Sequence, residues 1–341
     1  MARKEPWLAV NLSVLFSGIG HVYAGQRSVG LAFGVSQVLA IGFVVWSIFG
    51  ADGNTVIGLA LILPTLFIYV TNLFESYRSI SGISILEAQG SLNQRKDVWF
   101  AIFLSQLLPG LGHLHLDRAL VGAWLMGGTL LAIGLASKFP LFWMVPPILC
   151  AVACYHLYVS FASRRLDRQI MTVFLVALLV LRLGVAYLPL WTLQHIGQFK
   201  IPSESMVPTL QVGDRIFVAK VSNPMPQRGN LIVFHPVKGE NAADSTIQRF
   251  FVKRVIGEPG QQIQIRGGKV YVNGQPLLET YIAEAPNYQW GPEIVPPDSY
   301  FVMGDNRNDS FDSHVWGFLP QEDIVGRAYK IYWPPRRIQP L

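Results

Sequence analysis

Four short segments in the C-terminal part of the chain combine residue types that nucleophilic catalysis uses. They read IPSESMVPTL (201–210), GDRIFVAK (213–220), KRVIGEPG (253–260) and GDNRNDSFDSH (304–314). A serine hydroxyl becomes a useful nucleophile only when a neighbouring base takes its proton. A lysine can be that base only if its amine is neutral, because an ordinary lysine, with a pKa of about 10.4, is protonated at neutral pH.

Lys253 lies in an apolar run that predicts a strand and contains Phe250, Phe251, Val252 and Val255. Burial removes water from an ammonium group and so lowers the pKa of a lysine. Taken alone, this run favours a lysine that merely flanks a strand. A single serine likewise favours a turn or capping role, so the interpretation depends on the four segments together.

In this order the four segments resemble the type I signal peptidases, and the resemblance covers about residues 197–333. It implies a membrane-bound serine endopeptidase that removes signal peptides from secreted pre-proteins at small-x-small sites. The resemblance also implies that Ser205 is the nucleophile and Lys253 its general base. Neither a cofactor nor a metal belongs to this mechanism.

The same resemblance implies roles for residues around this pair. The hydroxyl of Ser203, with the backbone N–H of Ser205, is expected to stabilise the oxyanion, and Ser310 to position the lysine amine. The residues expected to hold the loops of the site are Asp305, Arg307 and Asp312. Those expected to line shallow substrate pockets are Phe199, Ile201, Pro202 and Val252.

Three positions depart from the pattern of the family. Glu204 stands where members often carry Gly, Gln261 where they often carry Asp, and His314 where they often carry Arg. His314 raises a rival mechanism, a triad of Ser205, His314 and Asp312, because triads are defined in space and not by spacing. The intact Lys253 favours the Ser/Lys pair. The histidines at 195, 235 and 314 lie in unrelated segments without further ligands, so no metal site is expected.

The sequence from residue 197 predicts a mainly antiparallel β domain. Apolar and polar residues alternate in short runs that are bounded by Gly, Pro and Asn. The pair Gly267-Gly268 predicts a turn between two strands, and Asn273-Gly274 a second turn. The predicted strands lie in DRIFVAK (214–220), GNLIVFHP (229–236), QRFFVKRVIG (248–257), QQIQIRGGKVYVNGQ (261–275) and GRAYKIYW (326–333).

Residues 1–196 contain nearly all the long apolar runs. Five are long enough to cross about 30 Å of hydrocarbon, and two, Trp7–Ala24 and Trp99–Leu116, are at the lower limit of length. The five predicted spans are Val29–Phe49, Thr55–Phe74, Ala119–Ser137, Leu141–Phe161 and Ile170–Leu193. No removable secretory signal is expected, since no small-x-small site follows the first apolar run.

The two shorter runs begin an internal repeat. WLAVNLSVLFSGIGHVYAG (7–25) matches WFAIFLSQLLPGLGHLHLD (99–117) at a constant offset of 92, and the match ends with LAIG at 39–42 and 131–134. Such a match predicts a duplicated membrane module. His21 and His113 recur at one repeat position, where hydrogen bonding to the hairpin backbone is a better interpretation than metal or haem binding.

The distribution of cations favours five spans over seven. If the two shorter runs do not cross, ten loop-proximal Lys and Arg residues lie inside and only Lys138 outside, as the positive-inside rule requires. If all seven cross, six lie inside and five outside. The glycines of the shorter runs also provide the tight turn that a re-entrant hairpin needs.

The net charge of +6 lies mainly in residues 1–196, with 12 Lys and Arg against 7 Asp and Glu, so topology explains it without a nucleic-acid partner. Cys150 and Cys154 lie four residues apart in one apolar run, and we interpret them as small residues of a helix interface. Arg182 lies near the middle of the last span, where a charge is normally paired or near water.

The predicted chain is thus an α-helical multi-span membrane domain followed by a β peptidase domain. Its expected parts are the duplicated module (1–163, with repeats at about 7–74 and 99–161), an anchor (164–196) and an extracytoplasmic peptidase domain (197–341). The expected location is the bacterial cytoplasmic (inner) membrane, and the expected partners are pre-proteins, the lipid bilayer and the secretion machinery. Two alternatives stay open: a peptidase that matures one substrate such as a pilin, and a non-catalytic docking protein.

Overall fold

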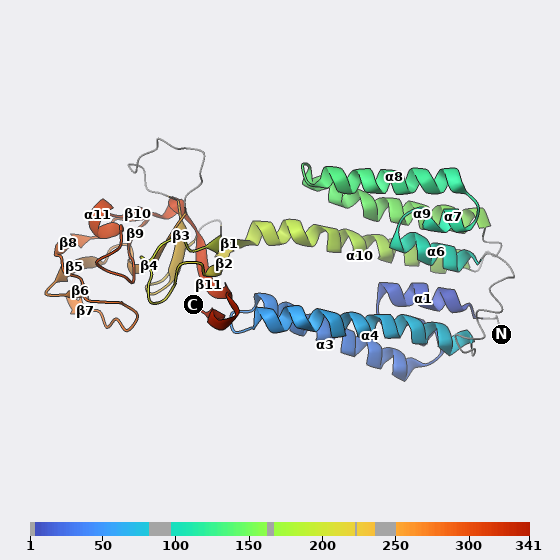
Figure 1. The fold of residues 1–341 in the computed structure, drawn as a ribbon, viewed down its shortest axis with the longest axis horizontal. Coiled ribbons are helices and arrows are strands. Elements are labelled where there is room, and N and C mark those ends of the chain that lie inside the picture. The colour runs from blue at the N-terminus through green and yellow to red at the C-terminus, as the bar shows by residue number, and fades with distance from the viewer. Residues whose placement is uncertain (1–3, 82–96, 162–166, 222–223, 236–249) are drawn as a thin grey trace. The chain divides into compact units, whose positions relative to one another are not determined.

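A computed structural model describes residues 4–81, 97–161, 167–221, 224–235 and 250–341 (Figure 1). The chain divides into two compact units. The first contains residues 1–44 and 60–192, and the second contains residues 45–59 and 193–341. The predicted boundary between residues 163 and 164 lies outside the described residues, and so do five of the ten cations predicted to lie inside, at positions 3, 95, 96, 164 and 165.

The first unit is helical, and its long helices confirm the five predicted spans. The helices long and apolar enough to cross a membrane are α3 (Arg27–Phe49), α4 (Thr55–Ser81), α8 (Ala119–Ala136), η1 with α9 (Pro140–Met144 and Val145–Phe161), and α10 (Asp167–His195). Each of the two shorter runs forms two short helices. They are α1 (Pro6–Leu15) with α2 (Ile19–Ala24), and α6 (Val98–Leu107) with α7 (Leu111–His115).

The break between the short helices has the same cause in both repeats. Gly18 and Gly110 adopt positive φ angles of 93° and 103°, which L side chains rarely adopt. A Cβ atom on Gly18 would lie 1.9 Å from the carbonyl oxygen of Gly30, and one on Gly110 would lie 2.3 Å from that of Gly122. Both pairs obey the offset of 92, so the same glycine-to-carbonyl contact occurs at equivalent positions of the two matched segments.

The repeated histidines bond to side chains, and not to the hairpin backbone as we expected. Nδ1 of His21 lies 3.3 Å from Oε1 of Gln26, and the His21 ring stacks on Phe33. Nε2 of His113 lies 3.0 Å from Nδ1 of His156. Among the described residues, no group of three or more His, Cys, Asp or Glu side chains could hold a metal ion.

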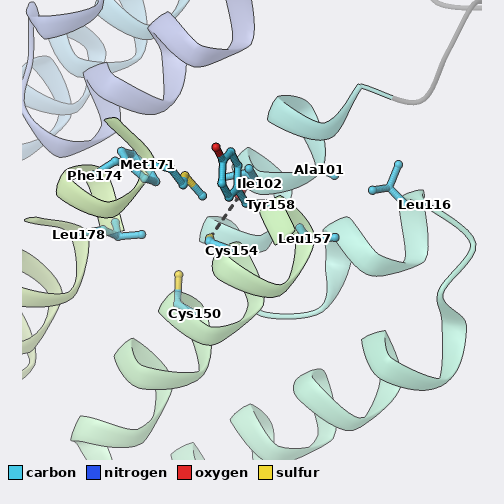
Figure 2. Close-up of a cluster of buried hydrophobic side chains, with 10 residues drawn as sticks. All are labelled: Ala101, Ile102, Leu116, Cys150, Cys154, Leu157, Tyr158, Met171, Phe174 and Leu178. Atoms are coloured by element: carbon cyan, nitrogen blue, oxygen red, sulfur yellow. Dashed lines mark hydrogen bonds between the residues drawn. The ribbon is translucent and has the colours of Figure 1, made fainter. Parts of the chain in front are cut away.

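Helix α10 packs into the second repeat through a buried apolar cluster (Figure 2). Cys150 and Cys154 of α9 are free, fully buried thiols in this cluster, as predicted for a helix interface. The thiol of Cys154 faces the carbonyl oxygen of Ile102 in α6 at 3.8 Å. The members that α10 contributes are Met171, Phe174 and Leu178.

Arg182 of α10 donates to the carbonyl oxygen of Gln106 at 2.6 Å. Gln106 is the second-last residue of α6, and the last carbonyls of a helix have no partner within it. Arg182 therefore caps the C-terminal end of α6, which ends inside the apolar unit.

The second unit confirms the antiparallel β domain. Its larger sheet has the strand order β1-β2-β11-β3-β4-β9-β10, with β12 paired to β11, and its smaller sheet has the order β7-β6-β5-β8. The strands of the larger sheet are β1 (Ile196–Lys200), β2 (Arg215–Lys220), β3 (Leu231–Phe234), β4 (Phe251–Gly257), β9 (Ser299–Met303), β10 (Leu319–Pro320), β11 (Ile324–Trp333) and β12 (Gln339–Pro340). Those of the smaller sheet are β5 (Gln262–Arg266), β6 (Lys269–Val272), β7 (Gln275–Pro276) and β8 (Trp290–Ile294).

Separate apolar clusters stabilise this unit. One is formed around β2, β3 and β11 and includes Ile201, Met206 and Leu210 from the segment between β1 and β2. Another joins the smaller sheet to β9 through residues such as Ile263 and Phe301. The segment that contains the two predicted catalytic serines is thus anchored on both sides by buried side chains.

Candidate active site

Ser203 and Ser205 lie in the loop that follows β1. Their hydroxyl oxygens are 3.4 Å apart, with Ser203 exposed and Ser205 half-buried. The loop is held by a segment that comes much later in the chain, because Asn306 donates its backbone N–H to the carbonyl oxygen of Ser205 at 3.1 Å. The Asn306 side chain also donates to the carbonyl oxygen of Glu204 at 3.3 Å.

Lys253 lies in the middle of β4, where it pairs with Ile232 of β3. It is only 2% exposed, so its amine lies among protein groups and not in water. Its Nζ donates to the hydroxyl oxygen of Ser310 at 2.8 Å. This contact was predicted from the family resemblance.

Ser310 and Asp312 continue this chain of hydrogen bonds. The Ser310 hydroxyl donates to Oδ2 of Asp312 at 2.6 Å, and the same oxygen accepts the backbone N–H of Gly304 at 2.8 Å. Asp312 is fully buried. Ser310 donates its hydroxyl proton to the carboxylate of Asp312, so the hydroxyl oxygen of Ser310 is the acceptor for the amine of Lys253.

Gly304 brings the serine loop and Ser310 together. A Cβ atom at this position would lie 2.4 Å from the carbonyl oxygen of Ser205 and 2.3 Å from the hydroxyl oxygen of Ser310. Those distances are shorter than any real Cβ contact, so only glycine fits. Gly304 therefore lies between Ser205, the predicted nucleophile, and Ser310, the partner of Lys253.

Asp305 and Arg307 each form an ion pair beside this site. Asp305 is fully buried and accepts from Arg254 through both carboxylate oxygens, at 2.8 and 2.6 Å. Arg307, also fully buried, donates to both oxygens of Glu279, at 2.9 and 2.5 Å. Two-point pairs of this kind fix orientation as well as charge.

Two half-buried tyrosines lie beside these charged groups. The ring of Tyr281 lies under the guanidinium of Arg254, 4.0 Å from the ring centre, and its hydroxyl donates to Glu279 at 2.9 Å. Burial, and then the charge of Glu279, raise the pKa of Tyr281. Burial, and then the charge of Asp312, raise the pKa of Tyr288.

His314 partners Asp312 from the side of the carboxylate that Ser310 does not use. Its Nδ1 lies 2.8 Å from Oδ1, and its ring stacks on Tyr288 with centres 4.0 Å apart. The departure from arginine at this position therefore still leaves Asp312 with a partner. Oδ2 of Asp312 instead leads through Ser310 to Lys253, which favours the Ser/Lys pair over the rival triad.

The predicted pocket residues gather near one end of β1 and β4. Phe199 meets Phe250 edge to face at 5.0 Å, and both pack against the same apolar cluster as Val252. Ile201 is buried at 2% exposure, whereas Pro202 is exposed. Ile201 therefore forms the floor of this region, and Pro202, Phe199 and Val252 reach its surface.

Arg254, Glu279 and Tyr288 belong to the site but were not predicted from the sequence. Arg254 follows Lys253 in the same segment, and a basic residue beside a buried lysine could have suggested a partner for Asp305. Glu279 and Tyr288 lie in segments without a motif, so only the structure reveals their contacts. Gln261 closes a turn by accepting the backbone N–H of Glu258 at 3.0 Å, which accounts for its place after Pro-Gly.

Known proteins resemble the part of the chain that carries this site. The family model described as signal peptidase, peptidase S26, matches residues 168–333. The chain is 54% identical over 144 residues to signal peptidase I of Leptolyngbya laminosa, which covers 41% of this chain and 70% of that protein. It is 40% identical over 148 residues to thylakoidal processing peptidase 1 of Arabidopsis thaliana, which covers 40% of this chain and 42% of that protein.

Among solved structures, a signal peptidase I from Enterococcus faecalis is 30% identical, covers 31% of this chain and 98% of its own, and gives a TM-score of 0.26. The family model begins at residue 168, so the duplicated segment lies outside its match.

Proposed function

The chain belongs to the signal peptidase I family of serine endopeptidases, which remove signal peptides, and from this premise we propose that Ser205 and Lys253 form its catalytic pair. The observation that carries the proposal is the hydrogen-bonded chain from Lys253 through Ser310 to Asp312, packed against the Ser205 loop at Gly304. The experiment that tests it compares cleavage of a pre-protein in lipid by the wild type and by Ser205→Ala.

In the proposed reaction, Oγ of Ser205 attacks the scissile carbonyl carbon while its proton passes to the neutral amine of Lys253. The tetrahedral oxyanion accepts hydrogen bonds from the hydroxyl of Ser203 and the backbone N–H of Ser205. When the C–N bond breaks, the lysine ammonium returns the proton to the leaving amine. The signal peptide then remains on Ser205 as an ester.

A water molecule completes the cycle. Lys253 takes a proton from the water as it attacks the ester carbonyl, and returns it to Oγ of Ser205 as the ester breaks. The products are the free serine and a signal peptide with a new carboxylate. Ser310 takes no part in proton transfer in this scheme, because its own proton is held by Asp312.

We propose that Asp305, Arg307 and Asp312 are positioning residues. Each is fully buried and paired, and their partners lie on different segments of the domain. Loss of one partner would leave a buried charge unpaired, which is strongly destabilising. Asp305 also accepts from the hydroxyl of Thr209, so the network joins the loop from Gly304 to His314 to the segment that follows Ser205.

Specificity is proposed to reside in Phe199, Ile201, Pro202 and Val252. Beside an extended substrate, these apolar side chains would favour alanine at the first and third positions before the cut. An apolar wall excludes large groups more strongly than it grades similar small ones. A broad set of precursors distinguishes this general peptidase from one that is dedicated to a single substrate such as a pilin.

The protein is membrane-bound, as its family and its five apolar helices indicate. We propose the bacterial cytoplasmic (inner) membrane, with the peptidase domain on the extracytoplasmic side. Only twelve residues separate Leu193 from Ser205, so at about 3.6 Å each the nucleophile lies within roughly 43 Å of the membrane. The Arabidopsis relative is named as thylakoidal, so fractionation of the two membranes tests this assignment.

The substrates of the family are pre-proteins that carry signal peptides. We propose the lipid bilayer and the secretion machinery as further partners. The first of these follows from the five apolar helices, and the second follows from the need to meet precursors as they emerge. A serine-directed acylating probe separates the enzyme from a non-catalytic docking protein, since only an activated Ser205 would be labelled.

A further inference from the structure

Lys330 of β11 is a buried lysine that the peptidase reaction does not use. Its side chain is fully buried, and its Nζ donates to three carbonyl oxygens: Ser47 at 3.1 Å, Ile48 at 2.9 Å and Gly50 at 2.9 Å. Ser47 and Ile48 belong to the last turn of α3, where the carbonyls of a helix lack partners within it and carry partial negative charge, and Gly50 directly follows the helix. A buried ammonium normally requires such compensation.

An irregularity in β11 determines the face of the sheet on which Lys330 lies. The register of β11 against β2 shifts between Ala328 and Lys330, and the adjacent residues Lys330 and Ile331 are both fully buried. A β-bulge of this kind breaks the alternation of faces and re-aims a side chain. Lys330 consequently pairs with Phe217, whereas Ala328 and Ile331 pair with Val218 and Ile216 of the apolar cluster around β2, β3 and β11. The shift therefore places Lys330 on the face of the sheet opposite to that cluster.

A second contact joins the turn between α3 and α4 to the larger sheet. Phe49 lies 5.7 Å from the ring of Phe217 in β2, and Phe217 stacks on Tyr332 of β11 at 4.2 Å. The turn itself is well fixed, because Asn54 accepts the backbone N–H groups of Val56 and Ile57 at the start of α4. In agreement with these contacts, residues 45–59 group with the β domain.

The sequence sets this turn apart from the duplication. The match between the repeats ends at Gly42, before Ser47, Ile48 and Gly50 are reached. The first repeat thus carries a tip of its own that the second repeat does not share. A turn that is present in only one of the two repeats is expected if that turn has a role outside the repeated module.

We propose that the turn between α3 and α4 is a structural component of the peptidase domain, docked by Lys330. The register Lys330↔Phe217↔Gln198 leads across β11 and β2 to β1, seven residues before Ser205. Lys330 is therefore a positioning residue: it holds the sheet that contains β1 to the turn of residues 45–59. The effect on processing rests on the proposed function, whereas the docking does not.

The test uses the full chain in lipid nanodiscs. Lys330→Met removes the three donors, and Arg327→Met, an exposed cation on the same strand, is the matched control. By hydrogen exchange, amides of residues 45–59 should exchange at least tenfold faster in Lys330→Met than in the wild type or the control. Unchanged exchange would overturn the docking.

The consequence for catalysis is measured on two substrates with the same cleavage site. Lys330→Met should cleave a short soluble peptide within twofold of the wild type, and a membrane-inserted pre-protein at least fivefold more slowly. Equal loss on both substrates would refute the positioning role. If the wild type cleaves neither substrate, the proposed function fails while the exchange result still decides the docking.

A second variant covers the case in which Lys330→Met does not fold. Phe49→Ala removes only the ring contact with Phe217 from the side of the turn. Faster exchange of residues 45–59 in this variant would support the docking, and exchange like that of the wild type would overturn it.

Discussion

His314 and Ser310 hold opposite oxygens of the Asp312 carboxylate: Nδ1 of His314 lies 2.8 Å from Oδ1, and the Ser310 hydroxyl lies 2.6 Å from Oδ2. The carboxylate is fully buried, so both partners are needed to satisfy it. His314 therefore helps to position Asp312 and Ser310, and it does not compete with Lys253 for the proton of Ser205.

The first prediction concerns these two candidate bases. Lys253→Ala should abolish cleavage, because no group then takes the proton of Ser205. His314→Ala should retain activity with a loss of about tenfold, as expected when a positioning hydrogen bond worth about 1.4 kcal/mol is removed. Turnover of a purified pre-protein measures both. A Lys253→Ala enzyme of near-normal turnover would refute the Ser/Lys pair.

The second prediction concerns the pH profile. Activity should rise with pH as the amine of Lys253 loses its proton. It should fall again above about pH 10, the ordinary pKa of tyrosine. The folded-state pKa values of Tyr281 and Tyr288 are raised, so their contribution to stability is complete below that pH and is lost as pH rises towards the folded values.

This alkaline limit is an unfolding event and can be recognised as one. Tyrosinate absorbance and loss of circular dichroism should appear together with the fall in activity. A fall in activity above pH 10 with an intact fold would contradict the explanation. Tyr281→Phe provides a control, because it removes one titrating phenol and should move the limit upward.

The third prediction concerns substrate specificity. A precursor with phenylalanine in place of alanine just before the cut should not be processed, because the region around Phe199 and Val252 offers only shallow space beside the buried Ile201. Processing assays with matched alanine, serine and phenylalanine precursors measure this. Serine should be tolerated, and efficient cleavage of the phenylalanine precursor would refute the pocket assignment.

The repeat and the candidate site could be predicted from the sequence because both depend on residues that few other residue types could replace. Gly18 and Gly110 recur at one offset because each needs a positive φ and a carbonyl contact that a side chain would block. Ser205, Lys253 and Ser310 could be predicted because their segments occur in the order that the family resemblance implies. Strands such as β5 and β6 could be predicted because their apolar and polar residues alternate clearly.

Other residues escaped because their roles depend on long-range contacts. Arg182 is interpretable only once the carbonyl of Gln106 is seen at the end of α6. Glu279 becomes part of the site through Arg307, 28 residues away. The role of Lys330 depends on the bulge in β11 that places it beside Phe217, and on three carbonyl oxygens 280 to 283 residues earlier in the chain. None of these features has a local periodic signal.

The fourth prediction concerns topology. In a five-span arrangement, a cysteine at Arg27 should react with an impermeant reagent from the cytoplasmic side, and a cysteine in the turn after α3 from the outside. Asp52 is the better position for the second probe, since a side chain on Gly53 would lie 2.5 Å from the carbonyl oxygens of Ser47 and Trp46. Seven spans predict the reverse labelling at both sites, which would also contradict the docking of the turn.

The fifth prediction concerns a chain that lacks residues 1–163. Ser203, Ser205, Lys253 and Ser310 all remain, and so do the strands that position them, so cleavage of a detergent-solubilised precursor should persist. The midpoint of thermal unfolding should nevertheless fall, because Lys330 loses the carbonyls of Ser47, Ile48 and Gly50. Hydrogen bonds to a charged group contribute roughly 1.5–3 kcal/mol each at most, so a loss of several degrees is expected.

A mutant cycle isolates this contact from other effects of the truncation. Lys330→Met should lower the unfolding midpoint clearly in the full chain and only slightly in the shortened one, where the ammonium is hydrated and its acceptors are absent. Equal effects in both would show that the stability of Lys330 comes from elsewhere. Complete loss of activity in a shortened chain whose β domain is folded would mean that the membrane module shapes the active site itself, since the Ser/Lys chemistry is otherwise contained in residues 197–341.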